Sequence, residues 1–172
     1  MDRDRELLRH FLGAIAYRAQ KALRDAPAHY PTFSAGHRAR TPLDIVRHMA
    51  SLMGYVTTHF VGGTYPVNPE PLPTFAAEVA RFHENLQKVG ALLESDAPLR
   101  DITLEQLLQG PLADTMTHVG QLAMLRRLAD SPVPPENFIY ADIRADRLDA
   151  NQPPPARPDQ HWPEAPDSGR GQ

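Results

Sequence analysis

The sequence predicts an all-α protein, a four-helix bundle with a proline-rich C-terminal extension. Four stretches of the 172-residue chain carry apolar residues at the three- and four-residue spacing of an amphipathic helix. Loops rich in proline and glycine join these stretches, and no stretch of any length has the alternation typical of a strand. Four such helices bury their apolar faces most simply against one another, as a bundle.

The first two helices are expected over residues 4–25 and 41–61. The first places one apolar face toward the core and ends before Pro27, because proline disfavours a helical conformation in the residue preceding it. The second begins with Thr41 as N-cap and Pro42 in the first turn, followed by Asp44 where a carboxylate favours the helix dipole. It ends at the two glycines 62–63.

The third and fourth helices are expected over residues 74–95 and 103–130. The third has an almost unbroken apolar stripe, typical of a packing helix with little room for polar chemistry: Phe75, Val79, Phe82, Leu86, Val89 and Leu93. The fourth begins with a capping box between Thr103 and Gln106. Gly110 and Pro111 interrupt it, which predicts a kink or a restart.

Two segments divide the chain, a bundle domain over residues 1–145 and a proline-rich irregular tail over residues 146–172. Residues 133–150 are expected to add at most a short helix or turn. Prolines exclude regular structure from residue 151 onward. Trp162 is a candidate anchor that packs this tail back on the bundle, because a lone tryptophan in a polar segment often buries its large ring.

Composition excludes several classes of function. The absence of cysteine excludes disulfides, thiolate nucleophiles and cysteine-based metal sites. A net charge of −3 and a pI of about 6.2 argue against a nucleic-acid-binding protein. The N-terminus is charged with mixed sign and no apolar run is long enough to span a bilayer, so we expect neither a signal peptide nor membrane insertion, and a cytoplasmic location.

Asp114 and His118 form the first candidate site. The apolar seam of the fourth helix steps by three and four residues, and His118 occupies one of its core positions. Asp114 lies one turn earlier and flanks the same seam. This spacing presents a carboxylate and an imidazole together, as in helix-borne zinc motifs. The same spacing also suits a hydrogen-bonded pair that merely orients a core histidine.

His48, in the second helix among apolar neighbours, is the second candidate. His59 lies eleven residues on and near the same face, but about 16 Å away at a rise of ~1.5 Å per residue, so it cannot share an ion with His48. A histidine on an apolar face is more often a satisfied core residue than a metal ligand. The remaining histidines are interpreted as surface or loop residues: His10, His29, His37, His83 and His161.

Residues 107–128 read LLQGPLADTMTHVGQLAMLRRL, and residues 41–49 read TPLDIVRHM. These two segments resemble the last and the second helix of the DinB-like (DinB/YfiT-like) metalloenzyme family. The last helix of that family carries His-x-x-x-His followed by Gly-Gln or Arg-Gly-Gln, and its second helix carries the first histidine of a metal triad. The resemblance covers roughly residues 5–145, and its most specific part is residues 118–121, HVGQ.

The resemblance implies a four-helix bundle with a site for a divalent metal ion such as Zn, Ni, Fe or Mn. His48 matches the first ligand and His118 the third. Asp114 stands where the family most often has histidine, and it either ligates the ion or leaves the site degenerate. The family also implies a homodimer, and a hydrolase or a transferase that uses a low-molecular-weight thiol, acting on a small-molecule substrate.

A second hypothesis stays open, a non-catalytic dimeric bundle whose metal site is degenerate or structural. A surplus of exposed apolar residues on the first or third helix would favour it. Two further residues depend on the enzyme hypothesis. Tyr55 is either a proton donor in the cavity or a packed core tyrosine, and Gln121 is either an outer partner of the metal ligands or a solvent-facing residue.

Overall fold

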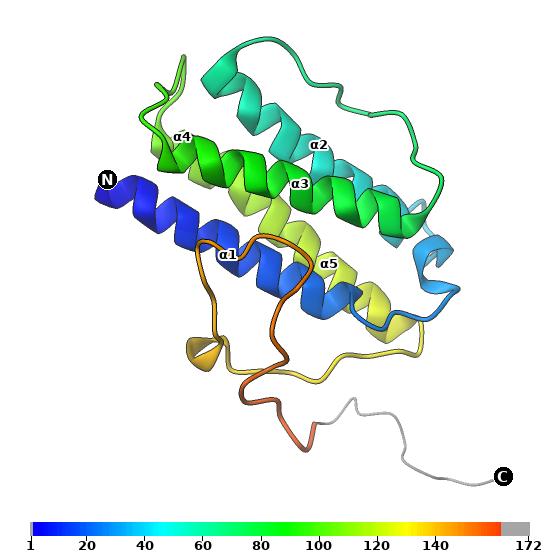
Figure 1. The fold of residues 1–172 in the computed structure, drawn as a ribbon. Coiled ribbons are helices and arrows are strands. Elements are labelled where there is room, and N and C mark those ends of the chain that lie inside the picture. Colours follow the sequence, from blue (N-terminus) through cyan, green and yellow to red (C-terminus); the bar gives the residue numbers. More distant parts are fainter. Residues whose placement is uncertain (1, 163–172) are drawn as a thin grey trace, which may run out of the picture.

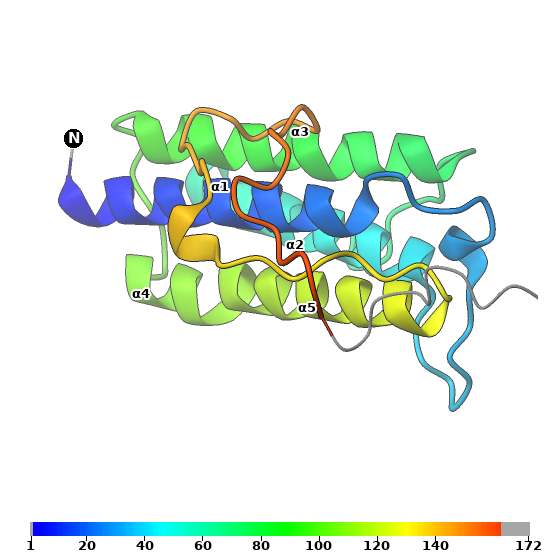
Figure 2. The same ribbon diagram turned by 90° about the horizontal axis from the view of Figure 1, so that it is seen from below.

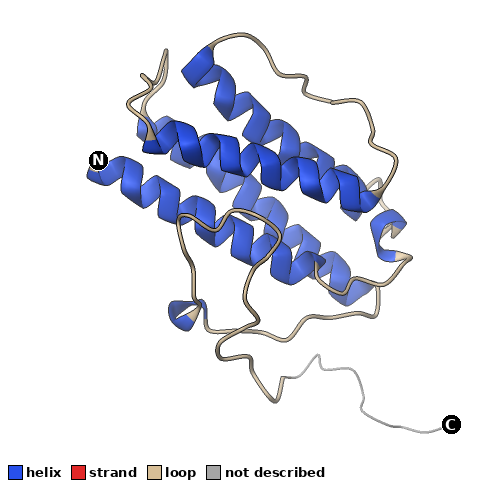
Figure 3. Ribbon diagram, viewed as in Figure 1, coloured by secondary structure: helices blue, strands red, loops and turns tan. Residues whose placement is uncertain are grey.

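The computed structural model describes residues 2–162, in which four helical rods pack side by side (Figures 1 and 3). Three of the rods are α1 (Arg3–Leu23), α2 (Pro42–Val61) and α3 (Phe75–Glu94). The fourth is composed of α4 (Leu104–Leu107), the π-helical segment η2 (Leu108–Leu112) and α5 (Ala113–Leu128). Two single 3-10 turns, η1 (Tyr30–Thr32) and η3 (Phe138–Tyr140), lie in the loops. The prediction of an all-α protein with four packed helices is confirmed.

Side-chain caps define the helix ends as the sequence predicts. Thr41 and Asp44 form a complete capping box at the start of α2, and Thr103 forms one with Gln106 at the start of α4. Gly62 ends α2 with a φ of 82°, a left-handed conformation that costs glycine little. The predicted kink is confirmed at Gly110, whose backbone is non-helical within η2.

A long crossover connects α2 with α3, so that these two helices run in the same direction while α1 and α5 run the opposite way (Figure 1). A helix of 20 residues such as α2 is about 30 Å long, and residues 62–74 are long enough to span it in extended form. The crossover packs closely on the bundle. The ring of Tyr65 lies where a Cβ on Gly54 would be, and Ser51 Oγ donates to the Pro66 carbonyl at 2.8 Å.

The core is apolar along its length. Its largest fully buried side chains come from every rod and include Leu12, Ile15, Met49, Met53, Phe82, Leu86 and Leu112. Arg126 is buried at the end of the bundle, where its guanidinium donates to carbonyls of Ala22 and Arg24 at 3.2 and 2.8 Å. It thereby satisfies carbonyls at the C-terminal end of α1. No helix within residues 2–162 has the length and apolarity required to span a membrane.

After α5 the chain turns back across α1 (Figures 1 and 2). Glu136 accepts from Tyr17 Oη at 2.8 Å and from Lys21 Nζ at 3.0 Å, which ties this segment to α1. Leu148 is buried and reaches α3 where Gly90 leaves room for it. Trp162 is partly buried. The boundary between residues 145 and 146 stays a prediction, and residues 163–172 of the expected tail lie outside the described part of the chain.

The interpretation of His83 as a surface residue is wrong. Only 3 % of His83 is exposed, and its Nδ1 donates to the Leu148 carbonyl at 2.8 Å. Glu78 and Asn85 are also buried on α3, so this helix holds more polar chemistry than its apolar stripe predicts. The crossover covers one flank of the apolar stripe of α3, at Glu78 and Asn85, and the segment around Leu148 covers the other flank, at His83. Helical periodicity alone does not reveal either cover.

Burial of His83 makes the stability of the fold depend on pH. Desolvation lowers the pKa of His83, whereas the Leu148 carbonyl and Asp149 oppose that shift more weakly. The unfolded chain takes up this proton near pH 6.5, and the folded chain resists it until a lower pH. Stability from His83 is therefore complete above about pH 6.5 and is lost as the pH falls toward the folded pKa.

We predict that His83→Asn reduces the pH dependence of unfolding. Between pH 7.5 and 5.5, the variant should lose about 1 kcal/mol less unfolding free energy than the unmodified chain, measured by urea titration. His48, whose pKa is also lowered, supplies a residual slope of the same sign. The control is His10→Asn, at an exposed position of α1, which should keep the full slope. An unchanged slope in His83→Asn would contradict the assignment.

Candidate metal centre

His48, Asp114 and His118 come together where α2 faces the start of α5. One donor atom from each residue lies within 4.8 Å of the other two. Asp114 Oδ2 is 3.8 Å from His48 Nε2, and Asp114 Oδ1 is 3.5 Å from His118 Nε2. The carboxylate thus lies between two imidazoles whose rings meet edge to face, with centroids 4.8 Å apart. The cluster could hold a metal ion.

The local sequence explains this convergence. His48 lies on α2 about two turns after the N-cap Thr41. The capping box of Thr41 and Asp44 fixes where α2 begins and thereby which face of the helix carries His48. Asp114 and His118 are four residues apart in α5, so they share one face. The break at Gly110 comes immediately before this turn and sets where α5 begins. Such π-helical segments are frequent beside functional sites.

Gln121 fixes the orientation of the His118 ring. His118 Nδ1 donates to Gln121 Oε1 at 2.8 Å, one helical turn away. In a neutral imidazole this leaves the lone pair on Nε2, the nitrogen that faces Asp114. Carbonyl acceptors play this part around many metal-binding histidines, since they hold the ring and raise its basicity. The interpretation of Gln121 as an outer partner agrees with this hydrogen bond.

The electrostatics of the site favour an unprotonated His48. Burial lowers the pKa of His48, and the positive charges of Arg40 and of a protonated His118 lower it further. The negative charge of Asp114, 3.8 Å from His48 Nε2, opposes the shift. Since a metal ligand must carry a free lone pair, a lowered pKa keeps His48 ready to bind at neutral pH.

The spacing of the donors fits a small divalent ion. Bonds of about 2.0–2.2 Å allow two ligands of one ion to stand up to roughly 4.3 Å apart. Each histidine Nε2 lies within this limit of one Asp114 oxygen, Oδ2 for His48 and Oδ1 for His118. The 4.8 Å that bounds the three donor atoms exceeds the limit, so the side chains must draw together to bind one ion. An ion can reach the cluster from solvent at Asp114, whose side chain is 48 % exposed, whereas the side chain of His118 is only 9 % exposed.

A cavity of about 620 Å³ lies beside His118. Its walls come from α5, from Ile45 of α2 and from the loop at Ala39 and Arg40, and are mostly apolar. The volume falls within the range of small-molecule sites. His118 and its hydrogen-bond partner Gln121 both line this cavity, so the cavity lies directly beside one of the candidate metal ligands.

Two residues considered from the sequence lie elsewhere. Tyr55 is 48 % exposed, which makes its interpretation as a packed core tyrosine wrong, and it does not line the cavity beside His118. Its ring contacts His59 edge to face, at 4.6 Å between centroids. His10, His29, His37 and His161 are exposed, as expected. The residue that sequence reasoning missed is Arg40, which follows from no helical pattern because it precedes α2.

Comparisons with known proteins add no relative. No family model matches the sequence, and no curated protein or solved structure matches it. The likeness to DinB-like proteins therefore stays a resemblance, carried by residues 41–49 and 107–128 and by the His48–Asp114–His118 cluster.

Proposed function

We propose that this protein is a divalent-metal-dependent enzyme, of the hydrolase or the thiol-dependent transferase type, with His48, Asp114 and His118 as metal ligands. The observation that carries the proposal is the convergence of three donor groups from two helices within 4.8 Å. The carboxylate of Asp114 takes the place that histidine most often has in the family resembled.

The donor set suits a borderline divalent ion. Two imidazoles and one carboxylate bind Zn, Fe, Ni or Mn, and three protein ligands leave positions open for water or substrate. An ion held by these residues supplies a Lewis acid, which both classes of reaction use. The negative charge of Asp114 makes the site a weaker Lewis acid than three histidines would.

The chain's own residues have separate tasks in this proposal. Gln121 holds His118 in the orientation that directs Nε2 toward Asp114. The apolar walls at Ile45 and Leu125 bind the apolar part of a small substrate and exclude water from it. Arg40, at the edge of the cavity, provides a positive charge beside the ligands.

The alternative, a non-catalytic dimeric bundle, has less support. It was expected to show a surplus of exposed apolar residues on the first or third helix. Among the described residues, Leu7 is the large apolar side chain exposed on α1, and α3 exposes none. A homodimer remains compatible with the enzyme and is our proposal for the assembly. Light scattering coupled to size-exclusion chromatography would measure its mass.

The experiment is a metal analysis of protein purified without a histidine tag. We expect one equivalent of a divalent ion per chain, lost in His48→Ala. Asp114→Asn should weaken binding at least tenfold, because an amide oxygen replaces a charged ligand. Asp114→His should retain the ion, since it restores the imidazole expected at this position.

His10→Ala is the matched control, since it removes an exposed histidine of α1 and should leave metal content unchanged. Absence of bound metal, together with no rise in melting temperature on adding divalent ions, would reject the proposal. Metal retained at full affinity by Asp114→Asn would instead show that the carboxylate only orients His118.

A further inference from the structure

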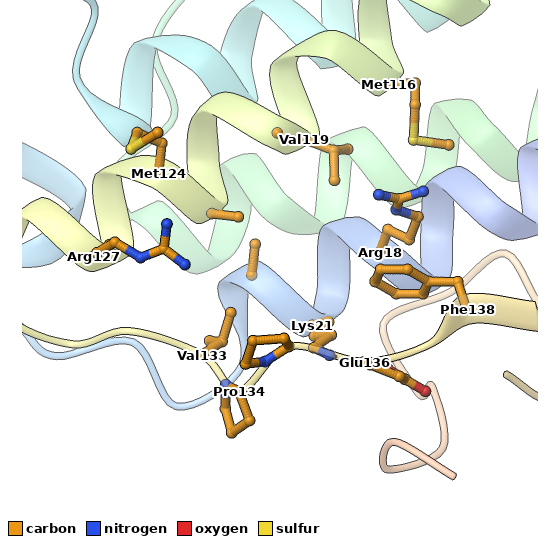
Figure 4. Close-up of a pocket in the computed structure, with 14 residues that line it drawn as sticks. Arg18, Lys21, Met116, Val119, Met124, Arg127, Val133, Pro134, Glu136 and Phe138 are labelled. Atoms are coloured by element: carbon orange, nitrogen blue, oxygen red, sulfur yellow. Dashed lines mark hydrogen bonds and ion pairs between the residues drawn. The ribbon is translucent and has the colours of Figure 1, made fainter. Parts of the chain in front are cut away.

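A second cavity, of about 320 Å³, lies between α1, α5 and the segment over residues 133–138 (Figure 4). None of the three candidate metal ligands lines it. It adjoins a neighbouring side of α5, and Gly120 and Met124 are the residues that both cavities share. The volume is at the lower end of the range for small-molecule sites.

The floor of this cavity is apolar. Met116, Val119 and Ala123 of α5 lie across from Ala22 of α1, and a wall of valine and prolines at residues 133–135 closes one side. Figure 4 shows the Val119 side chain between Met124 and Arg18, and the Met116 side chain above Arg18. A ligand that fills this space must therefore have an apolar body.

The charges around this floor are mostly positive. Arg18, Lys21 and Arg127 line the cavity against a single carboxylate, that of Glu136. Both Glu136 oxygens are already engaged, by Tyr17 and by Lys21, and no part of its side chain is exposed. The positive charge of Lys21 is thereby balanced within the protein.

Arg18 is different. Its guanidinium stacks on the ring of Phe138, 4.1 Å from the centroid, and it makes no ion pair with any carboxylate in residues 2–162. The ring covers one face of the guanidinium and leaves its N–H groups, which lie in the plane, free to donate to a planar anion. Figure 4 shows Arg18 beside Phe138 at the edge of the apolar floor.

We propose that this cavity binds a medium-chain carboxylate, with the anion at Arg18 and the alkyl chain along Met116 and Val119. A cationic ligand would be repelled by the Arg18 guanidinium, and a neutral ligand would offer it at most an uncharged acceptor, which binds a guanidinium more weakly than a carboxylate does. The carboxylate matches the guanidinium in shape and charge. This inference is independent of the proposed metal chemistry.

The test is binding of octanoate to the full chain, measured by calorimetry and by methyl NMR. We expect saturable binding that shifts the methyl resonances of Met116 and Val119. Octanol and octylamine, of equal chain length, should bind at least tenfold more weakly because neither offers an anion. The same measurements on His118→Ala should give the same octanoate affinity, which separates this site from the metal centre.

Arg18→Gln should weaken octanoate binding about tenfold or more, and Arg18→Lys should weaken it less because the charge remains. Arg3→Gln is the matched control. It removes the same charge at the exposed start of α1 and should not change binding. Circular dichroism verifies that each variant folds.

Three results would overturn the proposal. If octanol bound as tightly as octanoate, the site would not recognise a carboxylate. If both Arg18 variants kept the octanoate affinity unchanged, Arg18 would not be the residue that binds the anion. Shifts confined to Ile45 and Leu125 would place the ligand in the cavity beside His118 instead.

Discussion

His118→Ala is expected to lower the affinity for a divalent ion by more than about 100-fold. His118 is the most buried of the three candidate ligands, and its ring is already held by Gln121. Removing a ligand should cost more than the roughly 10–100-fold that loss of an outer hydrogen-bond partner costs. Competition with a chromophoric chelator measures the affinity.

Gln121→Ala is the companion variant that tests the cause. It removes the acceptor for His118 Nδ1 but no ligand, so we expect a loss of affinity between roughly 10- and 100-fold. Gln121→Glu should recover much of that affinity, since a carboxylate also accepts from Nδ1. Equal losses in His118→Ala and Gln121→Ala would contradict the separate roles assigned to these residues.

Glu78→Gln is expected to destabilise the fold by about 3–5 kcal/mol. Glu78 has no exposed area, and it accepts from Arg47 of α2 at 3.0 Å, from Arg81 and from the Leu72 backbone N–H at 2.9 Å. The substitution removes the carboxylate that two largely buried guanidinium groups share and leaves Arg47 only the half-exposed Asp44 at 3.5 Å, the kind of loss that costs most in protein interiors. Chemical denaturation measures the difference.

Ionisation of Glu78 is secured by its donors. Burial by itself raises the pKa of this carboxyl, but the Leu72 N–H, Arg47 and Arg81 together bring the pKa below its ordinary value. The folded chain therefore holds a charged Glu78 at neutral pH. Its contribution to stability is complete above the unfolded pKa near 4.3 and is lost as the pH falls through the folded pKa.

Glu94→Gln is the matched control for this prediction. Glu94 lies on the same helix and pairs with Arg9 at 3.1 Å, but its side chain is 58 % exposed. Exposed pairs contribute at most about 1 kcal/mol, because water solvates both charges once they separate. Similar losses in the two variants would show that the Glu78 cluster does not join α2, α3 and the crossover as described.

The helix ends were predictable from the sequence because their determinants are local. Thr41 with Asp44 and Thr103 with Gln106 are only three residues apart, and each pair satisfies backbone N–H groups of its own helix. The kink at Gly110 and Pro111 is local in the same way, because proline lacks the N–H that a continuous helix needs.

The roles of His83 and Glu78 were not predictable in this way. Their partners lie far along the chain or in loops, Leu148 for His83 and Arg47 for Glu78. Periodicity identifies one buried face of a helix, the one that meets the core. It does not show that loop segments cover the flanks of that face, which is where the two residues lie, on opposite sides of the apolar stripe.

Sequence by itself determined the helical class, the start of each helix and the pairing of Asp114 with His118, since these depend on spacing within one helix. Only the tertiary structure decided that His48 reaches the same point, because a contact between α2 and α5 depends on how the helices pack. Packing likewise decided the direction of the crossover and both cavities. Each of these features arises where segments distant in the chain contact one another, and local periodicity does not predict such contacts.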